Sequence, residues 1–124
     1  MNSERYQQGL EQMAALCGPD QVQRLQALEA VAPHLSRYAV EFFGDLYKDS
    51  ALDVKTQEIA TIAALVTLGN ASRQLKLHIN VALNVGCTRE EITSVITQMC
   101  AYAGFPAASN GMSVAREVFA ERDA

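Results

Sequence analysis

The sequence predicts an all-α fold, a compact single-domain bundle of five to seven helices over residues 1–124. Three observations favour this class. Apolar residues recur at helical spacing in five segments. The 3 prolines and 4 of the 7 glycines fall between these segments, and no stretch shows the sustained alternation of a β-strand. Hydrophobic residues make up 49% of the 124 residues and charged residues 19%, a balance that excludes intrinsic disorder.

The first half of the chain is divided by glycine and proline. The first predicted helix ends at Cys17–Asp20. Asp20 and Gln23 have the spacing of a capping box, which predicts Asp20 as the N-cap of a second helix. Pro33 marks the next boundary, because the residue before a proline avoids helical geometry. The apolar positions of the third helix are Leu35, Tyr38, Ala39, Phe42, Phe43 and Leu46.

The second half is divided more sharply. Asp53 is a favourable N-cap for a fourth helix, which ends at Leu68–Asn70. A fifth helix runs from about Ala71 to Gly86, and Thr88–Glu91 forms a complete capping box for the sixth. The apolar stripe of the sixth helix comprises Ile92, Val95, Ile96, Met99, Cys100 and Ala103.

Two helices are unusually apolar or small on one face. Gly104–Pro106 breaks the sixth helix, and the last helix then has a core face of small residues between Ala107 and Ala115. Leu75–Val85 is apolar most of the way round, so it must be covered on both sides. Either the domain itself or a second subunit could cover it. Together the two helices predict a homo-oligomer.

Charge and composition exclude several classes of function. The net charge is −4 and no basic run exceeds two residues, which disfavours nucleic-acid binding. The longest apolar stretch, Ile59–Val66, is too short to cross a membrane, and the polar N-terminus lacks a signal peptide. The chain has 3 cysteines and no CxxC pair, as expected of reduced thiols. These features predict a soluble cytoplasmic protein.

His78 and Glu58 are the candidate catalytic residues. His78 lies on an apolar helix face, where it could be a core histidine or a group that transfers protons near neutral pH. Glu58 lies one turn inside its helix, where it could form a surface pair with Lys55 or take part in a site. His34, beside Pro33, is expected at the surface.

The cysteines offer weaker candidates. Cys87 precedes a helix N-terminus, where the helix dipole would lower its pKa and make it the most reactive thiol. The interpretation we favour is still a loop cysteine without a role. Cys100 lies on the predicted apolar stripe and is expected to be a small buried hydrophobe. The sequence has no metal-ligand spacing, phosphate loop or nucleophile elbow, so no metal or cofactor site is predicted.

Four segments together resemble the carboxymuconolactone decarboxylase family. They are Arg5–Leu10, Leu52–Asp53 followed by Glu58, Leu75–Ile92 and Ala101–Ala108. The resemblance covers nearly the whole chain, and it implies a fold of the alkylhydroperoxidase D-like type with trimeric or hexameric assembly. It rests on the pattern H-x3-A-x3-G-x-T-x2-E combined with Y-A-G-x-P-A.

The redox branch of that superfamily has a CxxC pair between its glutamate and its histidine. In this sequence Asn70 and Arg73 occupy the two cysteine positions, and His78 arrives one residue late. Without these thiols there is no couple to reduce a peroxide. An alkylhydroperoxidase-like antioxidant activity is therefore disfavoured, whereas Glu58 and His78 match the decarboxylase branch.

The resemblance implies a lyase without a cofactor or metal that acts on a small molecule. Its reaction would convert 4-carboxymuconolactone to 3-oxoadipate enol-lactone and CO2 in protocatechuate catabolism. His78 would donate the proton, and Glu58 would orient His78 or share in acid–base chemistry. Because a fold does not determine a reaction, action on another small molecule and a non-catalytic binding oligomer remain alternatives.

Overall fold

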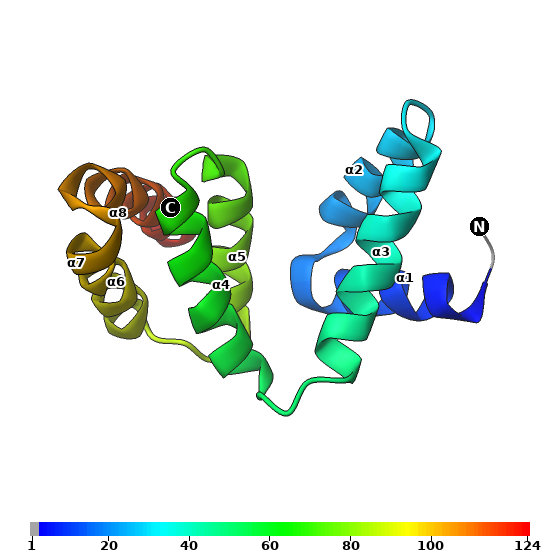
Figure 1. Ribbon diagram of the computed structural model, residues 1–124, viewed down its shortest axis with the longest axis horizontal. Helices are drawn as coiled ribbons and strands as arrows, with labels where there is room; N and C mark the ends of the chain where they lie inside the picture. Colours follow the sequence, from blue (N-terminus) through cyan, green and yellow to red (C-terminus); the bar gives the residue numbers. More distant parts are fainter. Residues whose placement is uncertain (1–2) are drawn as a thin grey trace. The chain divides into compact units, whose positions relative to one another are not determined.

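A computed structural model describes residues 3–124, and every regular element in that range is a helix (Figure 1). Seven of these helices have 10 or more residues, and the remaining one, α7, is a turn of 4 residues. The prediction of an all-α fold is therefore confirmed. None of the described helices has the length and hydropathy needed to cross a membrane. The chain divides into two compact units at residues 51 and 52, and each unit is described by itself.

The first unit contains α1 (Glu4–Cys17), α2 (Pro19–Glu29) and α3 (Pro33–Lys48), with α3 against both other helices. Ser3 accepts a hydrogen bond from the Tyr6 amide and so caps α1. The apolar core of this unit is formed by Tyr6, Met13, Leu25 and Val40.

Glycine allows α1 and α3 to cross with their backbones in contact. A Cβ on Gly44 would lie 2.8 Å from the Cα of Gly9, and a Cβ on Gly9 would overlap the carbonyl group of Val40. Larger residues could not occupy either position without moving a helix. Nearby, the buried Ser36 hydroxyl donates a hydrogen bond of 2.7 Å to the Leu25 carbonyl and so connects α3 to α2.

The predicted capping box at Asp20 is wrong. The helix α2 begins at Pro19, its N-cap is Gly18 with φ of 86°, and no side chain caps its first turn. Proline has a fixed φ and lacks the amide hydrogen that a first helical residue would leave unpaired, so it begins the helix before Asp20.

The helix α3 carries apolar residues on two faces. Val40 is buried, whereas Leu35, Tyr38 and Phe42 are 57%, 56% and 61% exposed. The helical periodicity therefore predicts the helix correctly, but it does not show which of the apolar residues are buried. His34 is exposed and its ring stacks on Tyr38, which confirms the expected surface position.

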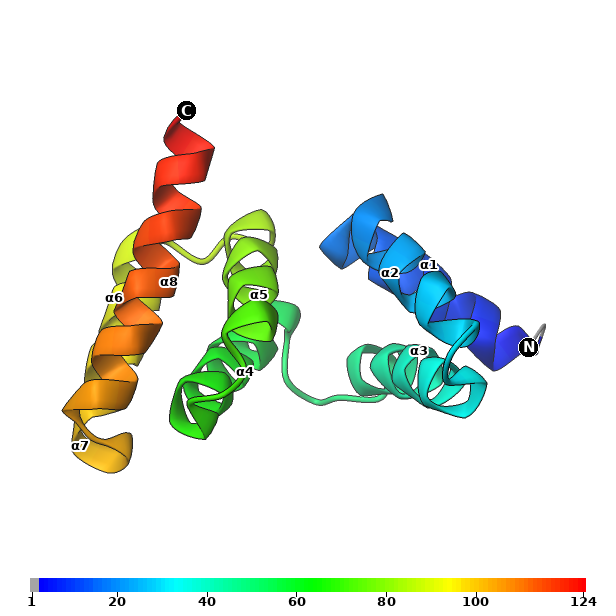
Figure 2. The ribbon, with the colours of Figure 1, turned by 90° about the horizontal axis from the view of Figure 1, so that it is seen from above.

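The second unit is a bundle of four longer helices and the short α7, shown from two directions in Figures 1 and 2. The helices α4, α5, α6 and α8 all contact one another around one apolar core. Their capping residues agree with the sequence analysis, since Asp53 accepts from the Thr56 amide and Thr88 and Glu91 form the capping box. The elements are α4 (Val54–Leu68), α5 (Ser72–Asn84), α6 (Arg89–Gln98), α7 (Cys100–Ala103) and α8 (Phe105–Asp123).

The small-residue face of α8 packs within this unit. A Cβ on Gly111 would lie 3.0 Å from a methyl group of Val66 and 3.3 Å from one of Ile96. Ala108, Ala115 and Val118 continue this buried face. The small face therefore lets α8 approach α4 and α6 closely.

The predicted helix from Ile92 to Ala103 is interrupted at Met99. The Met99 amide bonds to the carbonyl groups of both Val95 and Ile96, a tightened pattern common at helix ends. The chain then starts α7, and Cys100 is exposed instead of lying on the core stripe. The expectation that Cys100 is a buried hydrophobe is wrong for this reason.

The helix α5 is covered by its own unit and not left bare. Leu75, Ile79 and Ala82 are buried in the core, at 3%, 0% and 0% exposure. Its polar stripe faces charged and polar side chains of α8. The contacts join Lys76 to Glu117 and Glu121, and Arg122 to Asn80 and Asn84.

We expect Gly9→Ala to lower the free energy of unfolding by about 1–3 kcal/mol, because the new methyl group meets backbone atoms that cannot rotate away. This loss exceeds the gain of up to about 1 kcal/mol in helix propensity. Gly111→Ala is the matched comparison and should cost less, since its neighbours are side-chain methyl groups. Urea unfolding followed by circular dichroism measures both, and a stabilised Gly9→Ala variant would contradict the close crossing.

Candidate active site

Glu58 is a buried carboxylate in the second turn of α4. The Asp53 cap fixes the start of the helix, and the helical repeat then aligns Glu58 with Ile62 and Val66 on the core-facing stripe. All three side chains are buried, and Glu58 is 0% exposed. Burying a carboxylate without a partner costs several kcal/mol, roughly, so its environment must supply hydrogen bonds.

His78 supplies such a partner from the adjacent helix α5. Its Nδ1 lies 2.7 Å from Oε1 of Glu58, and the His78 side chain is 16% exposed. The structure therefore brings together the two residues that the sequence analysis selected. Glu58 is fully buried and meets His78, so it does not lie at the surface as the alternative of a surface pair with Lys55 required.

The geometry determines which ring nitrogen of His78 can meet a ligand. With the Glu58 carboxylate as acceptor, Nδ1 carries a hydrogen and donates it. A carboxylate in this position fixes the orientation of the ring and its tautomer. Nε2 is then the nitrogen that can give or take a proton.

Lys55 pairs with a different helix. Its Nζ lies 3.1 Å from Oε1 of Glu91, and the two side chains are 42% and 39% exposed. The same Glu91 oxygen accepts the Thr88 amide at 2.9 Å in the capping box of α6. The hydrogen bond from the Thr88 amide is the main cause of the lowered pKa of Glu91, and the bond from Lys55 lowers that pKa further. The capping box was visible in the sequence, but its second partner was not.

Cys87 is buried, at 4% exposure, and is not the activated thiol that its position before α6 suggested. Gly86, with φ of 105°, ends α5, and the Cys87 amide bonds to the Ala82 carbonyl as in a Schellman motif. The residue after the glycine in this motif packs onto its own helix. Burial raises the pKa of the Cys87 thiol, and the charge of Glu91 raises it further.

The two residues at the positions of the redox cysteines are not part of the Glu58–His78 contact. Asn70 and Arg73 are both exposed, in the middle of the α4–α5 loop and in the first turn of α5. Within residues 3–124 no group of three or more His, Cys, Asp or Glu side chains could hold a metal ion.

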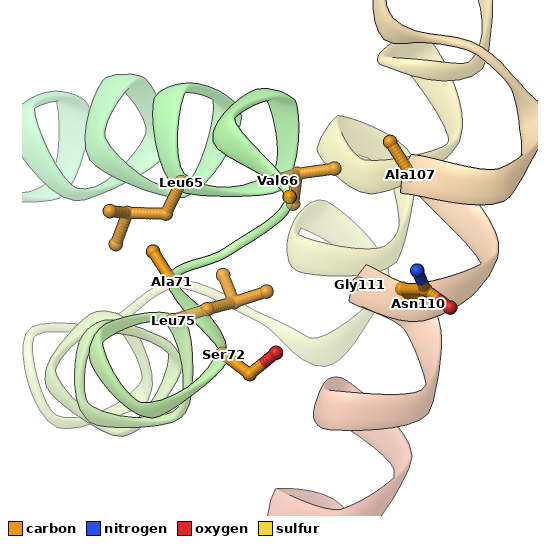
Figure 3. A pocket seen from close by; sticks show the side chains of 9 residues that line it. Leu65, Val66, Ala71, Ser72, Leu75, Ala107, Asn110 and Gly111 are labelled. Carbon is orange, nitrogen blue, oxygen red and sulfur yellow. The ribbon is translucent and has the colours of Figure 1, made fainter.

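A small pocket lies between α4, α5 and α8 (Figure 3). Its volume is about 10 Å³, close to the room that one water molecule needs. Its lining is mostly apolar, for example Leu75, with Ser72 and Asn110 as polar members. Neither Glu58 nor His78 lines it, and it is too small for an organic substrate.

Comparison with known proteins agrees with the motifs. The model of the carboxymuconolactone decarboxylase family matches residues 33–117, a range that contains both Glu58 and His78. The chain is 34% identical over 122 residues to 4-carboxymuconolactone decarboxylase of Acinetobacter baylyi, which covers 96% of this chain and 90% of that protein. It is also 34% identical over 101 residues to an uncharacterized 15.0 kDa protein from the nqo9–nqo10 intergenic region of Paracoccus denitrificans, covering 80% and 75%. The resemblance seen in the sequence is thus confirmed.

We expect thiol reagents to label Cys100 well before Cys87 at pH 8. Cys100 is exposed, whereas Cys87 is buried and its raised pKa keeps the thiol protonated at that pH. Site-resolved mass spectrometry after a short reaction with iodoacetamide measures the order. In Cys100→Ser the fast reaction at that site should disappear and Cys87 should stay slow. Fast labelling of Cys87 in the folded protein would contradict its burial.

Proposed function

Because the chain belongs to the carboxymuconolactone decarboxylase family, we propose that it converts 4-carboxymuconolactone to 3-oxoadipate enol-lactone and CO2. This carboxy-lyase reaction would place it in the catabolism of protocatechuate. The observation that carries the proposal is the pairing of buried Glu58 with His78 at 2.7 Å. A relative named for this reaction matches 96% of the chain, which supports it further.

The proposed reaction requires an acceptor for the electrons that CO2 leaves behind. The bond between the ring carbon and the departing carboxylate breaks, and its electron pair enters a double bond conjugated with the lactone carbonyl. An extended enolate results, and one proton added to its carbon gives the product. The substrate is thus its own electron acceptor, so the proposal requires no cofactor. The protein must desolvate the carboxylate, stabilise the oxyanion and deliver the proton.

His78 is the proton donor in this proposal. When the ring is doubly protonated, Nδ1–H donates to Glu58 and Nε2–H can be transferred to the enolate. After the transfer the neutral ring keeps its bond to Glu58, so it stays in place for the next turnover. The exposed 16% of the His78 side chain offers a path by which solvent can restore the proton.

We also propose that the protein assembles as a homo-trimer or homo-hexamer. The structure removes one reason for this expectation, since Leu75–Val85 is largely covered by its own unit. Another reason takes its place. Leu68, Tyr102 and Phe105 are 64%, 79% and 73% exposed, and large apolar side chains so open to water favour burial by another copy.

We expect His78→Ala to lower kcat by about 10²–10⁴, the usual contribution of a positioned acid or base. Glu58→Gln keeps the size of the side chain and should cost about 10–100-fold if it only orients the ring. The loss of ultraviolet absorbance of 4-carboxymuconolactone measures turnover. An equal loss in both variants would assign Glu58 to proton transfer as well.

His34→Ala provides the matched control, because this second histidine is exposed and should change neither turnover nor thermal midpoint. If His78 were only a packing residue, His78→Ala would lower the thermal midpoint while the folded molecules kept their activity. Unimpaired decarboxylation by a stable His78→Ala variant would end its assignment as the proton donor.

Sedimentation equilibrium at micromolar concentration tests the assembly. We expect a species of three or six times the chain mass of 13.5 kDa. Replacing Tyr102 or Phe105 by a charged residue should shift the distribution toward smaller species if these side chains lie in the interface. A single species of 13.5 kDa in the unaltered protein would contradict the proposal.

A further inference from the structure

We propose that Lys55 binds the carboxylate that the substrate keeps throughout the reaction, and that Lys55 therefore sets the preference for a doubly charged substrate. The inference rests on the proposed function for the identity of that substrate. The structure supplies the position of the cation, because Lys55 lies in the first turn of α4 and Glu58 in the second.

The helical repeat places Lys55 beside the reactive pair. Lys55 and Glu58 are the charged residues of α4, and they lie three residues apart. At this spacing two side chains share one face of a helix, with Cβ atoms about 5–6 Å apart. Glu58 turns into the core toward His78, whereas the longer Lys55 reaches the surface at 42% exposure. An ammonium group therefore lies on the solvent side of α4, one turn before Glu58.

Lys55 can exchange its present partner for a ligand. Its ion pair with Glu91 joins two exposed side chains across 3.1 Å, an arrangement that contributes little to stability. Glu91 has a separate role, because the same oxygen accepts the Thr88 amide at 2.9 Å. The end of α6 therefore stays capped if Lys55 turns toward a substrate carboxylate.

The other cations of the second unit are less suited to this role. Arg73 lies five residues before His78, which places it about 140° away around α5. Arg116 is an exposed residue of α8. Each remaining cation makes two or more hydrogen bonds to another helix, whereas Lys55 has the single ion pair with Glu91. These cations are Lys76, Arg89 and Arg122.

Cys87 gives independent support for the location. Its thiol donates to the carbonyl oxygen of Lys55 at 3.8 Å, so the loop after α5 touches the first turn of α4. After burial, the charges of Glu91, Lys55, Glu58 and Asp53 also influence the pKa of Cys87. The Lys55–Glu91 ion pair and the Cys87 contact therefore lie together at the end of the second unit where α4 begins.

The chemistry of the substrate decides which carboxylate Lys55 should hold. 4-Carboxymuconolactone carries two carboxylates and the product carries one. A cation on the departing carboxylate would stabilise the ground state and slow the loss of CO2. A cation on the retained carboxylate binds substrate and transition state alike, which lowers KM and leaves kcat unchanged.

Lys55→Met tests whether the charge affects KM and leaves kcat unchanged, because it nearly keeps the length of the side chain and removes the charge. We expect KM for 4-carboxymuconolactone to rise about 10–100-fold, the range for losing a charged hydrogen bond, with kcat changed less than about threefold. Lys55→Arg should recover most of the affinity. Arg116→Ala removes one positive charge elsewhere in the same unit and should leave KM unchanged.

Glu91→Gln separates ligand binding from a purely structural ion pair. Glutamine can fill the same place in a capping box, so α6 should keep its start while Lys55 loses its partner. We expect KM to be unchanged or lower in this variant. A rise in KM equal to that of Lys55→Met would show that the ion pair itself is needed, and it would overturn the inference.

A binding measurement distinguishes this inference from the proposed function. Glutarate, a dicarboxylate, is titrated into protein with ¹⁵N-labelled histidine while the ring signals of His78 are recorded. If these signals shift and Lys55→Met abolishes the shift, the Lys55 site stands even where the lactone is not decarboxylated. If Lys55→Met binds glutarate as well as the unaltered protein, or turns over the lactone with the same KM, Lys55 is not the carboxylate site. Failure of the unaltered protein to bind glutarate also overturns it.

Discussion

Burial of one carboxylate organises the second unit. A charged group at 0% exposure is stable only where hydrogen bonds replace its water, so Glu58 requires His78 at the matching height on α5. That requirement fixes how α4 and α5 lie along each other. Both helices that carry the pair have a defined end nearby. Asp53 caps the start of α4, and Gly86 follows the end of α5.

Local rules predicted most of the elements, because their signals act over a few residues. Asp53, Gly69 and Thr88 begin or end helices where the sequence analysis placed them. Two local predictions failed where two signals competed. Pro19 began α2 ahead of Asp20, and the tightened turn at Met99 ended α6 before Cys100.

The residues of the candidate site could be predicted from the sequence, but their contacts could not. His78 and Glu58 were selected by residue type and family resemblance, but helix periodicity could not show that Glu58 is buried in the core against His78. The pairing of Lys55 with Glu91 joins residues 36 positions apart, so only the packing of α4 against α6 reveals it. The raised pKa of Cys87 likewise depends on burial, which the approaching turn of α4 helps to create.

The polar seam between α5 and α8 has a consequence for the axial alignment of α8. The buried side of α8 is made of small residues, and Gly111 lies close to methyl groups of Val66 and Ile96. The seam adds a second, polar constraint, because Lys76 and Arg122 meet their acceptors at fixed heights along the helices. A shift of one residue, about 1.5 Å, would misalign all of these bonds together. Surface side chains that add little stability singly therefore favour together the same alignment of α8 that the close approach of Gly111 to α4 and α6 requires.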